Sequence, residues 1–240
     1  MTRRRIDSPA LLVRSVAYGE ADVVATFFTE TDGKLSAIAR GAQRSSKRFG
    51  GALEPIHELA VTLEDKGSEL CTLKEARITR ARTRVVADLD AMEAAGRALR
   101  WVRHLCPART PEPGAWRELG VLLDRLDAPG DAPFEQELAV FGLRLLADVG
   151  YGLELERCAI CGRPCPPHKD GRPRAAHVAS GGLVCSQCGG ARRTMSGELR
   201  TLAARAQQGE RVVMTKEDAN ALLAIVEDAL AAHTDYDPSK

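Results

Sequence analysis

Four cysteines late in the chain form two closely spaced pairs, Cys158-Ala-Ile-Cys161 and Cys185-Ser-Gln-Cys188. The C-x-x-C spacing lets two thiolates approach one tetrahedral zinc ion, and the glycine after each pair allows the backbone to turn tightly. The surrounding residues, 157–190, are mainly Gly, Pro, Cys and Arg, with too few large apolar side chains to bury a core. The pattern therefore predicts a small module held together by one structural zinc ion. The alternative is a loop with four free cysteines.

Four thiolates would fill every coordination position of that ion, so we expect a structural cross-link without catalytic activity. Cys165, His168 and His177 are nearby ligand types that could open the site, but the simpler interpretation makes them ordinary loop residues. The total of seven cysteines, an odd number, suits metal binding in a reducing compartment better than disulfides. No apolar run is long enough for a membrane helix. These features predict a cytoplasmic protein without a membrane partner.

Residues 9–78 have the composition and alternation of β-strands. Branched and aromatic residues are concentrated in five runs, at about 10–17, 22–29, 34–39, 56–63 and 69–78. Thr31-Asp32-Gly33 is a hairpin turn signal, and a Gly- and Arg-rich interruption at 41–55 follows the third run. Five strands with the long break after the third are the order of an OB-type β-barrel. We therefore expect a first domain over residues 1–80.

Beyond Val85 the apolar residues recur with the three- or four-residue spacing of amphipathic helices. The spacing predicts helices at about 87–105, 115–126, 134–149, 196–208 and 216–233. Thr215 is placed to cap the last of them. The predicted fold is thus α+β with two domains: the barrel, and a helical domain over 81–240 that carries a zinc-ribbon-like module inserted at 157–190.

The net charge of +1 conceals an uneven distribution along the sequence. Residues 34–53 contain five basic residues and no acidic one, and residues 76–87 contain four more basic residues and again no acid. A basic groove on an OB barrel can bind phosphates while an aromatic ring stacks on a base. The candidate DNA-binding residues are Lys34, Arg40, Arg44, Lys47, Arg48, Phe49, Arg77, Arg80, Arg82 and Arg84. Phe49 is equally well explained as a core residue that anchors the loop.

The sequence contains no G-x-x-x-x-G-K-[ST] loop and no evident paired carboxylates, so we expect no enzymatic activity. Asp88, Asp90 and Glu93 fit a solvated helix face, although a nuclease built from dispersed carboxylates would not be visible from spacing. A further class is a zinc-ribbon adaptor or transcription-associated protein that binds protein partners. Such a protein would keep the cysteine pairs but have no use for the basic loop.

Longer motifs follow one another in a fixed order along nearly the whole chain. Three of them are Ala10-Leu-Leu-Val-Arg14 with Tyr18-Gly-Glu-Ala-Asp22, Gly33-Lys-Leu-Ser-Ala-Ile-Ala-Arg-Gly-Ala42, and Arg48-Phe-Gly-Gly-Ala-Leu-Glu-Pro55. The last are the two cysteine pairs: Gly162 follows the first pair, and Gly181-Gly182 precedes the second. In this combination the sequence resembles the RecO family of recombination mediators. The first three motifs are similar to that family's N-terminal OB domain, and the cysteine pairs to its zinc module.

The resemblance implies a DNA repair and homologous recombination mediator without a catalytic site. Such a protein binds single- and double-stranded DNA, anneals complementary strands and helps load recombinase onto strands coated with single-strand binding protein. The implied partners are DNA, RecR and the C-terminal tail of single-strand binding protein, and the protein would be nucleoid-associated when on DNA. By motif match, Lys34 and Arg40 fall in the family's DNA-contacting stretch, whereas Arg44, Lys47 and Arg48 are added on charge alone.

Overall fold

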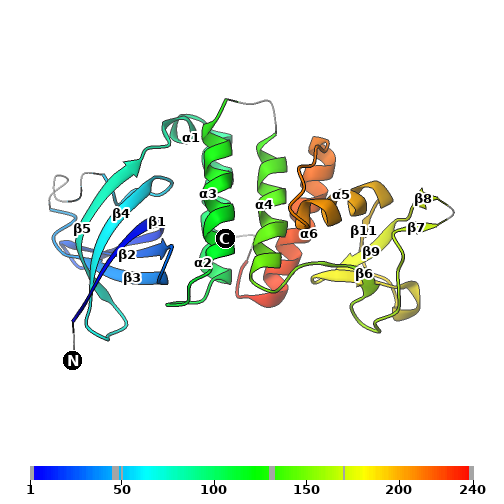
Figure 1. Ribbon diagram of the computed structural model, residues 1–240, viewed down its shortest axis with the longest axis horizontal. Coiled ribbons are helices and arrows are strands. Elements are labelled where there is room, and N and C mark those ends of the chain that lie inside the picture. Colours follow the sequence, from blue (N-terminus) through cyan, green and yellow to red (C-terminus); the bar gives the residue numbers. More distant parts are fainter. Residues whose placement is uncertain (1–2, 45–48, 50, 130–132, 170, 238–240) are drawn as a thin grey trace. The chain divides into compact units, whose positions relative to one another are not determined.

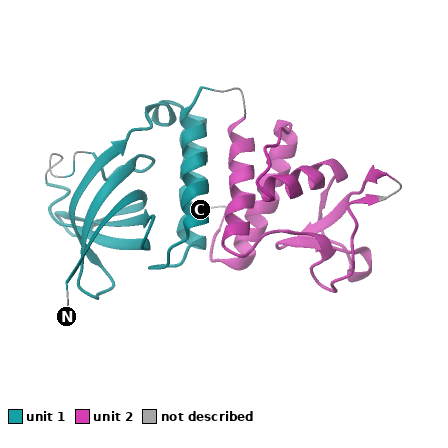
Figure 2. Ribbon diagram, in the orientation of Figure 1, with its two compact units in different colours: residues 1–129 teal, residues 130–240 magenta. Residues whose placement is uncertain are grey.

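The computed structural model describes the chain except for residues 1–2, 45–48, 50, 130–132, 170 and 238–240 (Figure 1). The chain forms two compact units, residues 1–129 and 130–240, shown in teal and magenta in Figure 2. The first unit therefore extends beyond the domain boundary that we predicted at residue 80. Unit 1 also contains three helices that follow the barrel, and two of them contact it.

Five strands form the first part of unit 1. They are β1 (Arg4–Tyr18), β2 (Asp22–Thr29), β3 (Gly33–Ala39), β4 (Glu58–Asp65) and β5 (Cys71–Arg80). They close into a barrel in the order β1-β2-β3-β5-β4, and β1 completes the circle by pairing with both β2 and β4. All five predicted strands are present. The first begins earlier than predicted, at Arg4, because its N-terminal half pairs with β4.

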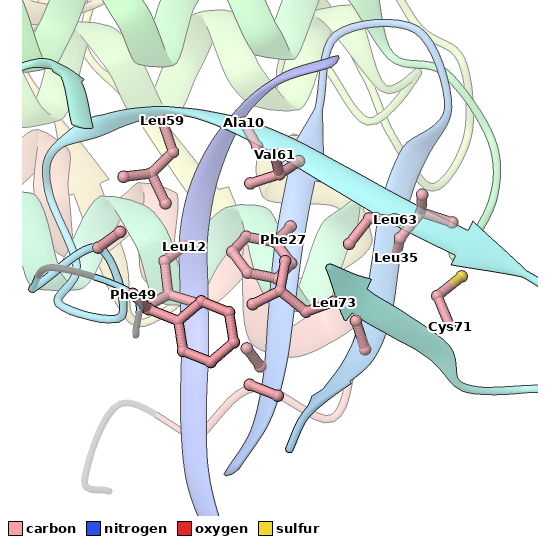
Figure 3. Close-up of a cluster of buried hydrophobic side chains, with 14 of the residues drawn as sticks. Ala10, Leu12, Phe27, Leu35, Phe49, Leu59, Val61, Leu63, Cys71 and Leu73 are labelled. Atoms are coloured by element: carbon pink, nitrogen blue, oxygen red, sulfur yellow. The ribbon is translucent and has the colours of Figure 1, made fainter. Parts of the chain in front are cut away.

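The barrel core is filled by every second side chain of the strands, as the period of a β-strand requires. Leu35, Ala37 and Ala39 of β3, for example, are buried, whereas the residues between them are half-exposed. Figure 3 shows the core with Phe27 near its middle and Phe49 among the side chains that close it. Full burial of one such large apolar side chain stabilises the fold by about 1.5–3 kcal/mol.

Three helices complete unit 1: α1 (Thr83–Ala87), α2 (Leu89–Leu105) and α3 (Pro113–Asp127). The Lys34 ammonium on β3 donates a hydrogen bond to the Arg103 carbonyl oxygen of α2. The Phe28 ring of β2 lies 5.8 Å from the Trp116 ring of α3, measured between ring centroids. Arg109, between these two helices, donates its backbone N–H to the carbonyl oxygen of Lys34 at 3.0 Å. These contacts attach the helices to one side of the barrel.

Unit 2 consists of three helices, α4 (Phe134–Asp148), α5 (Gly197–Gln207) and α6 (Lys216–His233), with a small β-rich module inserted between α4 and α5. As predicted, the Thr215 side chain caps α6 by accepting a hydrogen bond from the Asp218 backbone N–H at 3.1 Å. Among the described residues, no helix is both long enough and apolar enough to cross a membrane.

The inserted module contains short strands and one 3₁₀ turn. They are β6 (Glu154–Cys158), β7 (His168–Lys169), β8 (Arg172–Pro173), β9 (Ala176–Ala179), β10 (Gly182–Val184), η1 (Ser186–Cys188) and β11 (Arg193–Met195). Four of the strands form a sheet in the order β11-β9-β10-β6, and β7 and β8 form a separate hairpin. The parallel pairing of β6 with β10 brings the two cysteine pairs to the same end of the sheet.

Candidate metal centre and nucleic-acid surface

The four cysteines of the C-x-x-C pairs converge in the module. Cys158 ends β6, Cys161 follows it in a turn, Cys185 comes directly after β10, and Cys188 ends η1. Their four sulfur atoms all lie within 4.8 Å of one another, and the Sγ atoms of Cys161 and Cys185 are 3.8 Å apart. A tetrahedral ion with metal–sulfur bonds of about 2.3 Å requires sulfur separations of roughly 3.8 Å. The cluster therefore has the donor set and the size to hold one metal ion.

Backbone N–H groups stabilise negative charge in this cluster. The Cys185 N–H donates a hydrogen bond to the Cys158 Sγ at 3.3 Å, and this contact is the largest of several hydrogen bonds that lower the pKa of the Cys158 thiol to about 6. The pKa of Cys188 is instead raised, to about 12, first by its hydrogen bond with Cys161. Four thiols this close cannot all ionise unless a cation offsets their mutual repulsion. A bound cation would therefore favour the ionised form of all four thiols.

Each C-x-x-C pair and the turn around it, here called a knuckle, depends on the glycine that follows its second cysteine. Gly162 and Gly189 have φ angles of 69° and 95°, in the left-handed region that favours glycine. The Gly162 N–H donates to the Cys158 carbonyl oxygen at 2.8 Å, which closes the first knuckle. The glycines that follow the cysteine pairs in the sequence are thus required by the backbone around the sulfur cluster.

The three additional ligand types lie outside this cluster. Among the described residues, Cys158, Cys161, Cys185 and Cys188 form the metal-binding group without Cys165, His168 or His177. The Cys165 thiol donates to the Arg163 carbonyl oxygen at 3.6 Å, and His177 Nδ1 lies 2.9 Å from the Ala191 carbonyl oxygen. Their place outside the cluster agrees with the simpler interpretation, but His168 and His177 lie in the strands β7 and β9 and not in loops.

A buried arginine connects the module to the helices of unit 2. Arg200, on α5, is 1% exposed, and its Nε donates to the Leu155 carbonyl oxygen at 3.0 Å. The same guanidinium also donates to the carbonyl oxygens of Cys165 and Pro166. One side chain thus satisfies backbone acceptors on both sides of the first cysteine pair. The sequence analysis did not identify Arg200, because an arginine in a helical segment is normally exposed.

Two of the candidate DNA-binding residues are buried, and for these the sequence interpretation is corrected. Phe49 is 4% exposed and belongs to the barrel core, as its alternative interpretation proposed. Arg82 is fully buried, and its guanidinium binds the Asp124 carboxylate and the Ile56 carbonyl oxygen. A side chain without exposed surface cannot contact a phosphate, so Arg82 stabilises the fold.

Other candidates are engaged within unit 1. Lys34 is half-buried at the contact between the barrel and α2. The exposed Arg80 forms an ion pair with Asp124 at 2.7 Å. Arg84 has an exposed side chain at the start of α1. Arg77, on β5, is exposed in an open groove of the barrel that also contains acidic side chains. These positions do not form a continuous basic surface.

The exposed part of the predicted loop begins at the end of β3. Arg40 is exposed directly after this strand, and Arg44 is exposed in the turn beyond it, 3.8 Å from Glu20. An ion pair between two such exposed side chains contributes little, so Arg44 can exchange Glu20 for another anion. Lys47 and Arg48 lie outside the described residues, and their role as DNA contacts stays a prediction.

The outer face of the β1-β2-β3 sheet carries three exposed residues of β1 that are not among the candidates from the sequence analysis. Arg14 pairs in register with Thr26 of β2, which in turn pairs with Ser36 of β3. Val16 and Tyr18 follow Arg14 at intervals of two residues along β1. Val16 is 43% exposed and Tyr18 is 59% exposed. An arginine, an apolar residue and an aromatic residue therefore lie on the same face of one exposed strand. The period of two along β1 was the signal that could have identified them.

The fold and the sulfur cluster define a class: an α+β protein with an N-terminal five-stranded barrel, a helical part and an inserted four-cysteine centre able to hold a metal ion. The family model for the recombination protein O N-terminal region matches residues 1–82, and the model for the C-terminal region of the same protein matches residues 86–240. The chain belongs to the RecO family.

Individual relatives are similar to the chain over most of its length. The DNA repair protein RecO of Geobacter metallireducens is 31% identical over 227 residues, which cover 93% of this chain and 90% of the relative. The protein of the same name from Geobacter sulfurreducens is 36% identical over 75% of this chain and 71% of its own length. The one from Anaeromyxobacter sp. is also 36% identical, over 83% of this chain and 77% of its own length. The resemblance noted in the sequence is thus confirmed.

Proposed function

We propose that this chain is a DNA repair and homologous recombination mediator that binds single- and double-stranded DNA, anneals complementary strands and helps load recombinase onto strands coated with single-strand binding protein. Membership of the RecO family, whose relatives are named DNA repair proteins, supports the repair role. The exposed face of the barrel that carries Arg14, Tyr18 and Arg40 supports DNA binding.

The barrel is of the OB type, because its strand order β1-β2-β3-β5-β4 and the parallel pairing of β3 with β5 match that architecture. OB barrels bind single strands by combining basic side chains for the phosphates with aromatic faces for the bases. On this barrel Arg14 and Arg40 supply the charge, and Tyr18 supplies a half-exposed ring. Arg44 extends the basic surface into the loop. Lys47 and Arg48 are further proposed DNA contacts outside the described residues.

The metal ion in the four-cysteine centre is zinc, bound once per chain by Cys158, Cys161, Cys185 and Cys188. Sulfur-only, four-coordinate sites of this size are typical of structural zinc. When bound, the ion supplies a cross-link between β6 and β10 and no reactive position. The module that contains it is of the zinc-ribbon type.

The protein has no enzymatic activity, and strand annealing needs no nucleotide. Annealing is downhill once two strands meet, since stacking contributes about 1.4 kcal/mol for each base-pair step. The protein therefore only has to reduce the repulsion between two phosphate backbones. The family relationship also points to RecR and to the C-terminal tail of single-strand binding protein as partners, so strands coated by that protein remain substrates.

The barrel surface is tested by salt-dependent binding of a labelled single strand to Arg14→Ala/Arg40→Ala. Loss of two phosphate contacts should weaken binding and reduce the slope of log affinity against log salt by about 0.7 for each contact. A matched control is Arg5→Ala/Arg117→Ala, which removes two exposed, ion-paired arginines elsewhere in unit 1. If the first variant keeps its affinity and slope, DNA binds to another surface.

The activity is tested by annealing of labelled complementary strands, with and without ATP, and with coating protein that either has or lacks its tail. We expect annealing without ATP, and faster annealing of coated strands when the tail is present. Annealing no faster than the spontaneous rate would contradict the mediator function. A chain that binds no DNA at all but retains its zinc would instead favour the protein-binding adaptor.

A further inference from the structure

A pocket of about 400 Å³ lies beside the sulfur cluster of unit 2. Arg163 and Arg174 line it from the loops of the module, His177 lines it from β9, and Arg200 lines it from α5. Gln187, between the last two cysteines, also contributes to its wall. None of the described residues that line the pocket is acidic. The pocket is therefore a concave, positively charged site.

Among the described residues, the buried Arg200 guanidinium forms no ion pair within 4.0 Å. Its hydrogen-bond acceptors are the carbonyl oxygens of Leu155, Cys165 and Pro166, which satisfy the N–H groups but carry no net charge. Burial holds the pKa of Arg200 below its ordinary value, and the nearby Cys165 and Glu156 offset this effect only in part. A buried cation without a counterion is costly, so an anion in the pocket would stabilise this arrangement.

The two other arginines are available to the same anion. The Arg163 guanidinium donates to the Gln187 side-chain oxygen, which fixes it against the turn between Cys185 and Cys188. The Arg174 backbone N–H donates to the Pro167 carbonyl oxygen at 2.8 Å, and its side chain is exposed. In the described part of the chain, no carboxylate oxygen lies within 4.0 Å of a side-chain nitrogen of Arg163, Arg174 or Arg200.

This absence of counterions distinguishes the module from the barrel. In unit 1 Arg80 and Arg82 are neutralised by Asp124, and Arg109 is neutralised by Asp65 at 2.7 Å. The stretch 157–193, in contrast, contains seven lysines and arginines and a single acidic residue. A zinc ion with four thiolates would add a net charge of about −2, which leaves the stretch positive. The excess points to a polyanion.

We propose that this pocket binds the phosphate backbone of a nucleic-acid strand through the exposed side chains of Arg163 and Arg174, separate from the barrel surface. The buried Arg200 adds positive charge behind the pocket wall without contacting the phosphate. Three further exposed basic side chains of the module favour an extended polyanion over an acidic peptide that ends in the pocket: Arg157, Arg172 and Arg192. The inference rests on the proposed DNA-binding function and adds a site to it. Each of the two units would then carry its own phosphate contacts, as the binding of two strands requires.

The decisive variant is Arg163→Ala/Arg174→Ala, because both side chains are exposed and their loss leaves Arg200 and the cysteines intact. Binding of a fluorescein-labelled oligo-dT to the full chain is measured over a salt series. We expect affinity to fall on the order of tenfold at low salt, and the salt slope to fall by about 0.7 for each contact. Zinc content and circular dichroism, which report folding of the module, should not change.

The matched control removes the same charge from β11 and α5, at positions that do not line the pocket. Arg205→Ala and Arg193→Ala each remove an arginine that is ion-paired, with Glu210 and Asp228 respectively. The double variant Arg193→Ala/Arg205→Ala should keep the affinity within about twofold. An equal loss in control and pocket variants would mean that only net charge matters, and it would overturn the proposed pocket.

A footprint on the unmodified protein gives a second readout. Phenylglyoxal modifies accessible arginines, and the oligonucleotide should protect Arg163 and Arg174 but not Arg205 from it, as measured by mass spectrometry. Absence of protection in a protein that binds the oligonucleotide would overturn the pocket and leave the proposed function standing. Protection by a poly-glutamate peptide, with none by oligo-dT, would assign the pocket to an acidic protein partner. If the wild-type chain binds no DNA, the proposed function itself fails.

Discussion

The Asp124 carboxylate on α3 accepts two hydrogen bonds from the buried guanidinium of Arg82, from Nε at 3.2 Å and from Nη2 at 2.9 Å. Arg82 also donates to the Ile56 carbonyl oxygen, just before β4, at 3.0 Å. One arginine therefore links α3 to the end of the barrel. Because Arg82 has no exposed surface, it cannot exchange Asp124 for water.

Removing the charge of Asp124 should leave the buried Arg82 with only the more distant Glu58 carboxylate, at 3.9 Å, as a counterion. We expect Asp124→Asn to lower the free energy of unfolding by about 2 kcal/mol, less than for a fully buried pair because Asp124 is partly exposed. Urea denaturation measures the change. Glu210→Gln, which breaks the exposed ion pair with Arg205, should cost less than about 0.5 kcal/mol. Equal effects of the two substitutions would contradict a special role for Arg82.

Gly33, at the start of β3, lies directly against the backbone of Thr110. A Cβ atom at this position would be 2.0 Å from the Thr110 carbonyl oxygen, and the φ angle is +67°. Gly33→Ala should therefore separate the helices from the barrel edge and destabilise unit 1 by about 2 kcal/mol or more. Gly96→Ala in α2, where nothing lies within 4 Å, should instead stabilise by about 0.5–1 kcal/mol. Thermal melting of the two variants should shift in opposite directions.

The sulfur cluster can be tested without reference to DNA. Cys161→Ser/Cys188→Ser removes one ligand from each knuckle, so the zinc content should fall from one per chain to near zero. Limited proteolysis should then cut within 157–190, because that stretch has little apolar core to hold it. Cys165→Ser should keep its zinc, since Cys165 lies outside the cluster. Undiminished zinc in the double variant would show that other residues bind it.

The ion pair of Asp65 and Arg109 should make the stability of unit 1 fall at acid pH. The Arg109 guanidinium, at 2.7 Å, holds the pKa of Asp65 below its ordinary value, and the Gly67 backbone N–H adds to this effect. A lowered folded-state pKa means that the unfolded chain binds the proton first. The stabilisation is therefore complete above the ordinary aspartate pKa of about 4 and is lost as pH falls through the folded value.

Urea unfolding between about pH 6 and about pH 3 measures this contribution. Asp65→Asn should be less stable than the wild type at the higher pH and should show a smaller decline on acidification. Arg109→Met should remove the same part of the decline, because the pKa shift has the same cause. A full decline in both variants would show that other carboxyl groups govern the acid sensitivity.

The secondary structure could largely be predicted from local patterns. The alternation of β-strands predicted the run that forms β3, and the hydroxyl of Thr215 marked the start of α6, because both signals depend on neighbours in the sequence alone. The metal centre was equally local in origin, since each C-x-x-C pair brings two sulfur atoms together within one turn. The family relationship followed from the order of these motifs.

Tertiary structure decided whether each basic side chain is buried in an ion pair or exposed. Arg82 and Arg40 are equivalent in the sequence, each a basic residue in a run without acids, yet Arg82 is buried against Asp124 and Arg40 is exposed. Asp124 is distant in the sequence, and only the packing of α3 on the barrel brings its carboxylate to Arg82. Likewise, Arg163, Arg174 and Arg200 come from separate segments, so no local pattern could show that they line one pocket. Sequence determined the elements and the sulfur ligands, whereas the folded chain decided which cations retain no carboxylate partner, because ion pairing depends on distance in space.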